Sequence, residues 1–377
     1  MIDITSSVCP DRSLIKPCEC YEIRRHENQL SCYGNEYIDL VKIFQTLENN
    51  LTKTGKHFKV FHLNNTFISE LKENTFSDIT FDEILIKSCA KLKSIHKNAF
   101  NTTDQVITIL TIEDTPMLTS PDNSIFQSLS KFVRAEYITL SLTNITEIPS
   151  NAFQTIEGKQ DHLDGLIFIG SSFRKLGNNA FSQFNNLSIL QFLDTSIDFI
   201  PENAFQFNDD SEKPLTIIFQ RNSKLNCSVK FSKNSLIKFK RPTTIFFRSF
   251  STKNYISCKM KYLEQKIFLP FLRSNKENQI SLHDDSIDLR IKKEPQLNCS
   301  DCRNNWLLSN SELLKRVEEF PSCTQRRKFA DPVNFINCPD EISKNNGMIN
   351  YQENGCGLFT MITLSIIRIY SYNSVKI

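Results

Sequence analysis

The hexapeptide IPENAF at residues 200–205 belongs to a string that recurs along the chain. Related strings are LKENTF (71–76), IHKNAF (95–100), IPSNAF (148–153) and LGNNAF (176–181). Each begins with an aliphatic residue, continues through residues that favour turns, and ends with Phe. A string that returns at such intervals is typical of a repeat protein in which each unit packs against its neighbours.

A short alternation of apolar residues precedes each string and also occurs between them. A period of two predicts a strand that buries one of its faces. The apolar pairs are Phe61/Leu63, Ile84/Ile86, Leu110/Ile112, Ile138/Leu140, Leu166/Phe168, Leu190/Phe192 and Ile217/Phe219. Each strand and the string after it would form one coil, in which the string belongs to the segment that returns to the next strand. The Phe of each returning segment would fill the middle of its coil, which accounts for 30 Phe in 377 residues. The pattern therefore predicts an α/β repeat solenoid.

A polar or small side chain is expected inside each turn, three residues after the second apolar residue of a pair. Such a side chain would bond backbone groups that the coil leaves unpaired. The expected positions are Thr66, Cys89, Thr115, Thr143, Ser171, Thr195 and Asn222. At its position, Cys89 is interpreted as a buried structural thiol.

The cysteines gather near the two ends of the chain. Cys9, Cys18, Cys20 and Cys32 form one cluster, and Cys299, Cys302, Cys323 and Cys338 form the other. Clusters that flank a cysteine-poor middle predict disulfides and an oxidising compartment. Cys227 and Cys258 are predicted to close a further loop, whereas Cys356 could be free, lipidated or bonded to another chain.

Glycosylation sequons support a secreted or extracellular location. They begin at Asn50, Asn64, Asn101, Asn144, Asn186, Asn226 and Asn298. No apolar segment precedes Cys9, so no signal peptide is visible. We interpret the sequence as mature or truncated at its start; the alternative is a protein that is not secreted.

The cysteine spacing resembles the caps of extracellular leucine-rich-repeat proteins. The spacing C-x8-C-x-C-x11-C over Cys9–Cys32 is similar to their N-terminal cap, and Cys299 to Cys338 with Trp306-Leu-Leu is similar to their C-terminal cap. The resemblance implies a leucine-rich-repeat horseshoe with short parallel strands on the concave face and disulfide-stapled caps at both ends. It implies the disulfides Cys9–Cys20, Cys18–Cys32, Cys299–Cys323 and Cys302–Cys338. The family usually has C-x-C before its Trp-Leu, whereas this chain has C-x-x-C.

The C-terminal third also resembles one arthropod group of such proteins. The strings FLPFL (268–272) and ISL (280–282), together with the paired cysteines and Trp306-Leu-Leu, are similar to proteins of the oplophorus-luciferin monooxygenase non-catalytic subunit type. This resemblance implies a chain that stabilises an enzyme without catalysing its reaction.

These features divide the chain into five segments. We expect an N-terminal cysteine cap over residues 1–45, repeats over 46–225 and an irregular basic segment with the last degenerate repeats over 226–297. A C-terminal cysteine cap over 298–338 and a tail over 339–377 follow. The tail ends in a short apolar run from Cys356 to Ile367, which is too short to span a bilayer. Soluble secretion is the expectation, with anchoring at the cell surface as the alternative.

No motif for catalysis, a cofactor or a metal is found. The six His are scattered, and Gly-rich phosphate loops and nucleophile motifs are absent. The pair Cys299 and Cys302 could form half of a zinc site, but no second C-x-x-C follows. The sequence therefore predicts a protein that is not an enzyme, with no cofactor and no metal.

One segment is strongly basic. Residues 221–266 contain twelve Lys or Arg and one acid, Glu264, which gives a net charge of +11. Lys238, Lys240, Arg241 and Arg248 are the candidates for an anionic ligand such as a glycosaminoglycan or a membrane surface. The alternative is a solvated loop. A nucleic-acid partner is not expected in an extracellular compartment.

The predicted function is a secreted, non-enzymatic scaffold that binds proteins or other ligands. A protein partner would dock on the concave face of the strands, over Lys59, His62, Thr111, Thr139, Ser141, Ile167 and Gln191. Two alternatives are a non-catalytic stabilising subunit of a secreted enzyme complex and a structural protein of the extracellular matrix.

Overall fold

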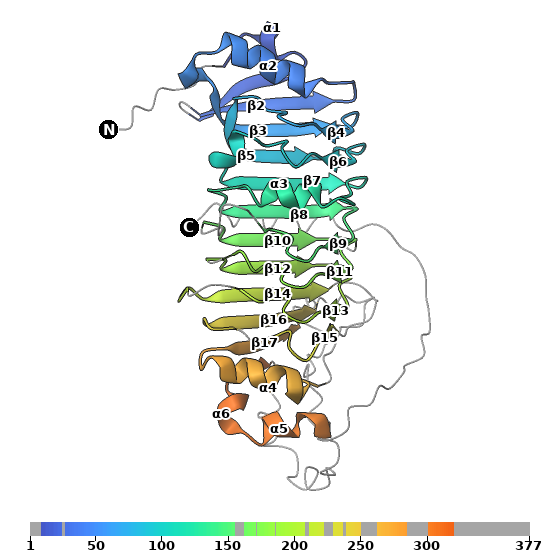
Figure 1. Ribbon diagram of the computed structural model, residues 1–377, viewed down its shortest axis with the longest axis vertical. Helices are drawn as coiled ribbons and strands as arrows, with labels where there is room; N and C mark the ends of the chain where they lie inside the picture. Colours follow the sequence, from blue (N-terminus) through green and yellow to red (C-terminus); the bar gives the residue numbers. More distant parts are fainter. Residues whose placement is uncertain are drawn as a thin grey trace, which may run out of the picture. The chain divides into compact units, whose positions relative to one another are not determined.

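The computed structural model describes residues 9–24, 27–154, 162–170, 172–184, 186–207, 211–221, 229–236, 239–249, 262–284 and 301–319. Within residues 1–338, one sheet of twelve strands dominates (Figure 1). Its strands are β1 (Glu19–Arg24), β2 (Glu27–Gly34), β3 (His57–Asn65), β5 (Thr80–Lys87), β7 (Ile109–Thr115), β8 (Tyr137–Thr143), β10 (Gly165–Ile169), β12 (Ile189–Leu193), β14 (Leu215–Arg221), β16 (Thr243–Ser249), β17 (Gln279–Asp284) and β18 (Val317–Glu319). They lie side by side in this order.

Only the first pair of strands, β1 and β2, is antiparallel, and every later pair is parallel. Three two-stranded parallel sheets lie in the returning segments. They pair β4 (Glu70–Leu71) with β6 (Ser94–Ile95), β9 (Glu147–Ile148) with β11 (Lys175–Leu176), and β13 (Phe199–Ile200) with β15 (Lys230–Phe231).

The expected fold class, an α/β leucine-rich-repeat horseshoe, is wrong. The structure is a large, open, mixed but mostly parallel sheet with few helices. In the described residues the helices are α1 (Arg12–Ile15), α2 (Leu40–Asn50), α3 (Ser124–Leu129), α4 (Gln265–Ser274), α5 (Asn305–Leu308) and α6 (Ser311–Leu314), with short 3-10 helices at Lys53–Gly55, Thr103–Gln105 and Cys302–Asn304. Between β3 and β16, α3 is the only α-helix that the described residues contain.

The recurring string explains why the returning segments are not helical. Asn74, Asn151, Asn179 and Asn203 all have φ between 50° and 59°. This left-handed conformation interrupts an α-helix, and Asn tolerates it better than most residues. Backbone bonds then join one string to the next, as from Asn74 N to Asn98 O at 3.0 Å and from Asn179 N to Asn203 O at 3.1 Å.

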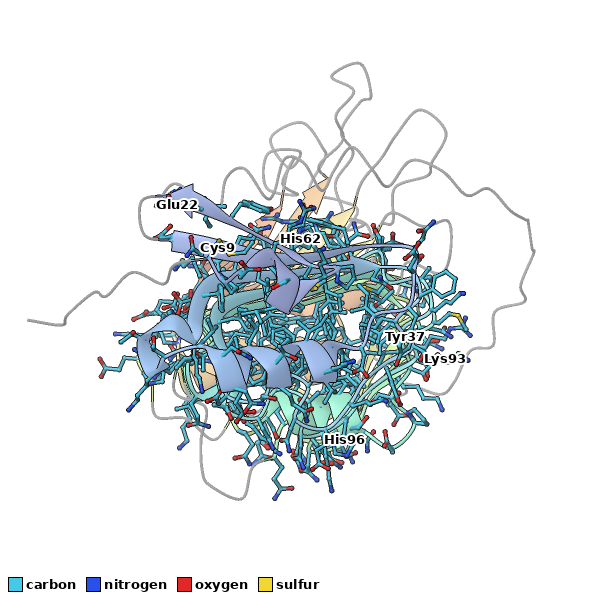
Figure 2. All side chains as sticks on the ribbon, turned by 90° about the horizontal axis from the view of Figure 1, so that it is seen from above. Cys9, Glu22, Tyr37, His62, Lys93 and His96 are labelled. Atoms are coloured by element: carbon cyan, nitrogen blue, oxygen red, sulfur yellow. A yellow bond between two sulfur atoms is a disulfide. The ribbon has the colours of Figure 1, made fainter. Side chains whose placement is uncertain are left out.

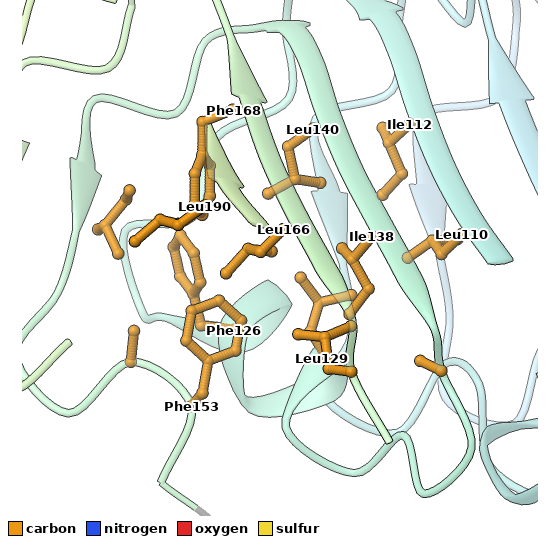
Figure 3. Packing of buried hydrophobic residues seen from close by; sticks show 14 of the residues in the cluster. Leu110, Ile112, Phe126, Leu129, Ile138, Leu140, Phe153, Leu166, Phe168 and Leu190 are labelled. Carbon is orange, nitrogen blue, oxygen red and sulfur yellow. The ribbon is translucent and has the colours of Figure 1, made fainter. Parts of the chain in front are cut away.

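The core lies between the large sheet and the returning segments. All seven predicted apolar pairs lie in strands of the large sheet, and their side chains are buried. Figure 3 shows part of this core, with Phe126, Leu129 and Phe153 of the returning segments beneath the strand residues. Four Phe rings from neighbouring strands are stacked, at centroid distances of 5.6 Å (Phe168–Phe192), 5.3 Å (Phe192–Phe219) and 5.6 Å (Phe219–Phe247).

Where the structure describes them, the side chains inside the turns follow the prediction except at the first turn; Ser171 and Asn222 lie outside the described residues. Cys89, Thr115, Thr143 and Thr195 are buried. At the first turn Asn65 takes the place predicted for Thr66: its Oδ1 accepts from the N–H groups of Phe67 and Ile68, and its Nδ2 donates to Glu36 O. Cys89 Sγ donates to Leu63 O, and burial raises the pKa of its thiol to about 11, so the thiol stays protonated at neutral pH.

Candidate interaction surfaces

The face of the large sheet that points away from the core is called here the outer face. Along β7 and β12 buried and half-buried residues alternate, so every second side chain points outward. Figure 2 shows His62 on this face, away from His96 on the opposite side of the coils. Six of the seven strand residues expected to bind a partner, from His62 to Gln191, lie in register on the outer face, and one of them, Ser141, is buried. The strand pairings do not include Lys59, which lies between the buried Phe58 and Phe61.

The N-terminal part of the outer face carries a network of hydrogen bonds across β1, β2 and β3. Gln29 Nε2 donates to Tyr21 Oη at 2.6 Å and to Ser31 Oγ at 2.8 Å. Tyr33 Oη lies 2.9 Å from His62 Nδ1, and the two rings meet edge to face. Tyr21 and Tyr33 are both 41% exposed, so this network is open to a partner.

Burial is the main cause that lowers the pKa of His62 below 6.5, and the charge of Lys87 acts in the same direction. His62 is therefore neutral at pH 7. Its Nε2 is buried and makes no hydrogen bond with the described residues.

Charged residues surround this N-terminal network. Lys59 Nζ lies 3.2 Å from Asp82 Oδ2, and Lys87 Nζ lies 2.9 Å from Glu113 Oε2. These ion pairs join side chains of neighbouring strands. They mark β2 to β7 as the polar end of the outer face.

The middle of the outer face has a different composition. Strands β8, β10 and β12 are paired in register, and none of their nine outward positions is charged. These positions, called here the central outer face, are Tyr137, Thr139, Ser141, Gly165, Ile167, Ile169, Ile189, Gln191 and Leu193. Depletion of charge with retention of aliphatic and aromatic side chains is typical of the core of a protein interface.

Tyr137 has a fixed position on the central outer face. A Cβ atom at Gly165 would lie 2.5 Å from Tyr137 Cδ1, so the ring occupies the space that a larger residue would need. Tyr137 Oη donates to Asp164 Oδ2 at 2.7 Å, and this bond is the main cause that raises the pKa of Tyr137 to about 12. Lys213 forms an ion pair with the other oxygen of Asp164. Such a fixed aromatic side chain loses little entropy on binding.

The basic segment does not form one exposed cationic surface in the part that the structure describes. Arg241 is only 3% exposed, its guanidinium lies over the Phe207 ring at 5.3 Å, and its Nη1 donates to Lys213 O. Arg248 is half-buried over Phe246 at 5.1 Å, and Lys240 is exposed. Lys238 lies outside the described residues, so the anionic-ligand hypothesis for the group stays a prediction.

Two disulfides close the N-terminal end. Cys9 is bonded to Cys20 and Cys18 to Cys32, the pairs that the resemblance implies. Cys302 is also disulfide-bonded. Several predicted residues lie outside the described residues: Cys227, Cys258, Cys299, Cys323, Cys338, Cys356, Asn226 and Asn298.

The five remaining sequons have positions that are compatible with glycosylation, which stays a prediction. Asn50 and Asn144 are exposed, and Asn64, Asn101 and Asn186 are half-buried. None of these five side chains belongs to the core.

The described residues contain no group of three or more His, Cys, Asp or Glu that could hold a metal ion. In the same residues, no helix has both the length and the apolar character to cross a membrane.

Sequence reasoning missed the network of Tyr21, Gln29, Ser31 and Tyr33. No motif marks these residues, because their contacts depend on the antiparallel register in which Tyr21 lies opposite Gln29. It also missed Tyr137, Ile169 and Leu193 of the central outer face. A count of charges at every second strand position would have found these three.

Comparison with known proteins gives one distant relative and no family. No family model matches the chain. The chain is 21% identical over 343 residues to the oplophorus-luciferin 2-monooxygenase non-catalytic subunit of Oplophorus gracilirostris, a match that covers 87% of each chain. The match extends over nearly the whole length, but the identity is too low to establish a family.

Proposed function

We propose that this protein is a non-catalytic subunit of a secreted complex, in which it binds and stabilises another protein chain. The single observation that carries the proposal is the central outer face, where nine neighbouring positions on three strands have no charge. A monomer gains nothing from leaving Ile167, Ile169, Ile189 and Leu193 half-exposed, whereas a bound partner would cover them.

Two further observations support the proposal. The distant relative is named as a non-catalytic subunit, which favours this function over a general adhesion module. Disulfides at Cys9–Cys20 and Cys18–Cys32 suit an oxidising compartment, as secretion requires.

A partner on the central outer face would be held by its apolar contacts and positioned by Tyr137. Its hydroxyl and the Asp164–Lys213 ion pair supply polar groups at the edge of the apolar area. An apolar centre with a polar rim is the usual arrangement of an interface that binds tightly.

The test uses the tagged chain to recover a complex from the fluid into which the protein is naturally secreted. The wild-type chain is expected to retain one partner in stoichiometric amount through gel filtration. The double variant Ile167→Lys/Leu193→Lys would place two charges in the interface and weaken binding by about 100-fold.

The matched control is Gln154→Lys, which adds a cation at an exposed position outside the outer face. It should bind as the wild type does. Equal recovery of the partner by the double variant, with its fold intact by circular dichroism, would refute this docking site. An isolated wild-type chain with no partner would refute the subunit hypothesis itself.

A further inference from the structure

Four successive turns expose large side chains along the edge of the sheet where β2, β3, β5 and β7 end. Their residues Tyr37, Phe67, Lys91 and Met117 each directly precede a buried aliphatic residue: Ile38, Ile68, Leu92 and Leu118. Tyr37 is 73% exposed, Phe67 45% and Met117 43%. Together with Lys93, which is also exposed, these residues are called here the edge strip.

The turns of the edge strip contain a residue that core packing does not require. Two residues separate the buried Asn65 from Ile68, and two separate Cys89 from Leu92. In later coils one residue is enough, between Thr143 and Ile145 and between Thr195 and Ile197. The extra residue in the first coils is therefore not needed to close the turn.

Neighbouring turns hold the strip in place. Thr66 N donates to Gly34 O at 3.1 Å, Lys93 N to Ser69 O at 2.8 Å, and Thr119 N to Lys93 O at 3.0 Å. Lys91 Nζ lies 3.6 Å from the centre of the Phe67 ring, a cation–π contact that fixes both side chains. Figure 2 shows Tyr37 and Lys93 on the same side of the molecule, away from His62.

The charge of the strip indicates the kind of partner. Neither Lys91 nor Lys93 forms an ion pair with a carboxylate of the described residues. The exposed acid Glu36 lies at the end of the strip, beside Tyr37. Apolar rings with cations between them complement a surface that presents apolar side chains and carboxylates together.

We propose that the edge strip is a second docking site, which binds an apolar and acidic segment of another protein. Phe67, Met117 and Tyr37 would contact large apolar side chains, and Lys91 and Lys93 would pair with carboxylates. This inference goes beyond the proposed function, because the strip is separate from the central outer face and requires no catalytic chain.

The experiment uses a display library of random twelve-residue peptides selected on the immobilised full chain. Selected peptides are expected to place Asp or Glu next to aromatic or aliphatic residues. The strongest peptide, labelled and measured by fluorescence polarisation, should bind at least 10-fold more weakly to Lys91→Glu/Lys93→Glu and to Phe67→Ser/Met117→Ser. Selection on the Lys91→Glu/Lys93→Glu chain should yield basic peptides instead.

Two controls separate this site from other effects. Lys230→Glu/Lys233→Glu makes the same charge change at exposed lysines far along the chain and should leave peptide affinity unchanged. Ile167→Lys/Leu193→Lys should also leave it unchanged, so failure of the proposed subunit function would be visible separately.

Peptides without an acidic bias, or peptides that bind both strip variants as tightly as they bind the wild-type chain, would overturn the proposal. Self-association of the wild-type chain that disappears in Phe67→Ser/Met117→Ser would also overturn it, because a second copy would then be the occupant. Sedimentation velocity of both chains decides this point.

Discussion

Two groups of coils share one sheet and one strand register: the first coils, around β3, β5 and β7, and the later coils, around β10, β12 and β14. They differ in the buried side chains, in the charge of the outer face and in the turns. The first coils fill the second buried strand position with Leu63, Ile86 and Ile112, whereas the later coils use a stack of Phe rings. The first coils have charged outer positions and longer turns. The later coils have an uncharged outer face, and the turn that the structure describes in full, after β12, is shorter by one residue.

The comparison teaches that the strand register and the surface chemistry vary independently. Parallel pairing needs only backbone groups and an apolar residue at every second position. The outward residues and the extra turn residue are free to change without cost to the core. Each region can therefore be altered alone, and the three predictions below use this property.

The largest expected effect is loss of a ring from the Phe stack. Phe192→Ala should lower the free energy of unfolding by about 4 kcal/mol, because it opens a cavity and removes two stacked contacts. Ile112→Ala, at the equivalent position in the first coils, should cost about 3 kcal/mol. Urea denaturation measures both. A smaller loss for Phe192→Ala than for Ile112→Ala would show that the stack adds no stability.

A smaller effect is expected at Gly177, which lies against the backbone of the preceding returning segment. A Cβ at Gly177 would lie 2.1 Å from Ser150 N, so Gly177→Ala must displace backbone and should cost about 2 to 3 kcal/mol. In the first coils the equivalent residue of the string is His96, whose side chain is accommodated. Gly55→Ala, whose Cβ would make ordinary contacts from 3.5 Å, is the control for thermal unfolding. Equal melting temperatures for the two variants would contradict the close approach.

The smallest expected effect is on the pH dependence of the free energy of unfolding, which should differ between the polar end and the central outer face. The pKa of His62 is lower in the folded chain than its ordinary 6.5, so the unfolded chain binds the proton more tightly. The contribution of neutral His62 to stability is present above pH 6.5 and is lost as pH falls towards its folded pKa. His62→Gln should flatten this part of the stability profile, whereas Gln191→Asn on the central outer face should not. An unchanged slope in His62→Gln would assign the pH dependence to other groups.

The sequence predicted the strands because apolar alternation follows directly from a strand with one buried face. It did not predict the returning segments, because the left-handed conformation of Asn151 or Asn203 is a property of single residues that periodicity does not record. The helices that an α/β fold class implies are absent from most coils in the described residues, and the α/β horseshoe was wrong.

The candidate sites were less predictable than the strands. The inner turn residue was placed at Thr66 instead of Asn65, because Asn65 follows the second apolar residue, Leu63, by two residues and not by the three that the later coils have. The buried position of Arg241 over Phe207 also has no signature in a run of basic residues. Both outcomes depend on contacts between residues that are distant in sequence.

The order of strands in the large sheet follows the order of the chain, beginning with the hairpin β1–β2 that two disulfides hold. Each strand that leaves the ribosome therefore meets a neighbour that has already been synthesised, and it needs no later segment to complete its pairing on that side. Such a chain can fold in the direction of its synthesis. Its growing end presents one unpaired strand at a time, which limits the exposure of edges that would otherwise lead to aggregation.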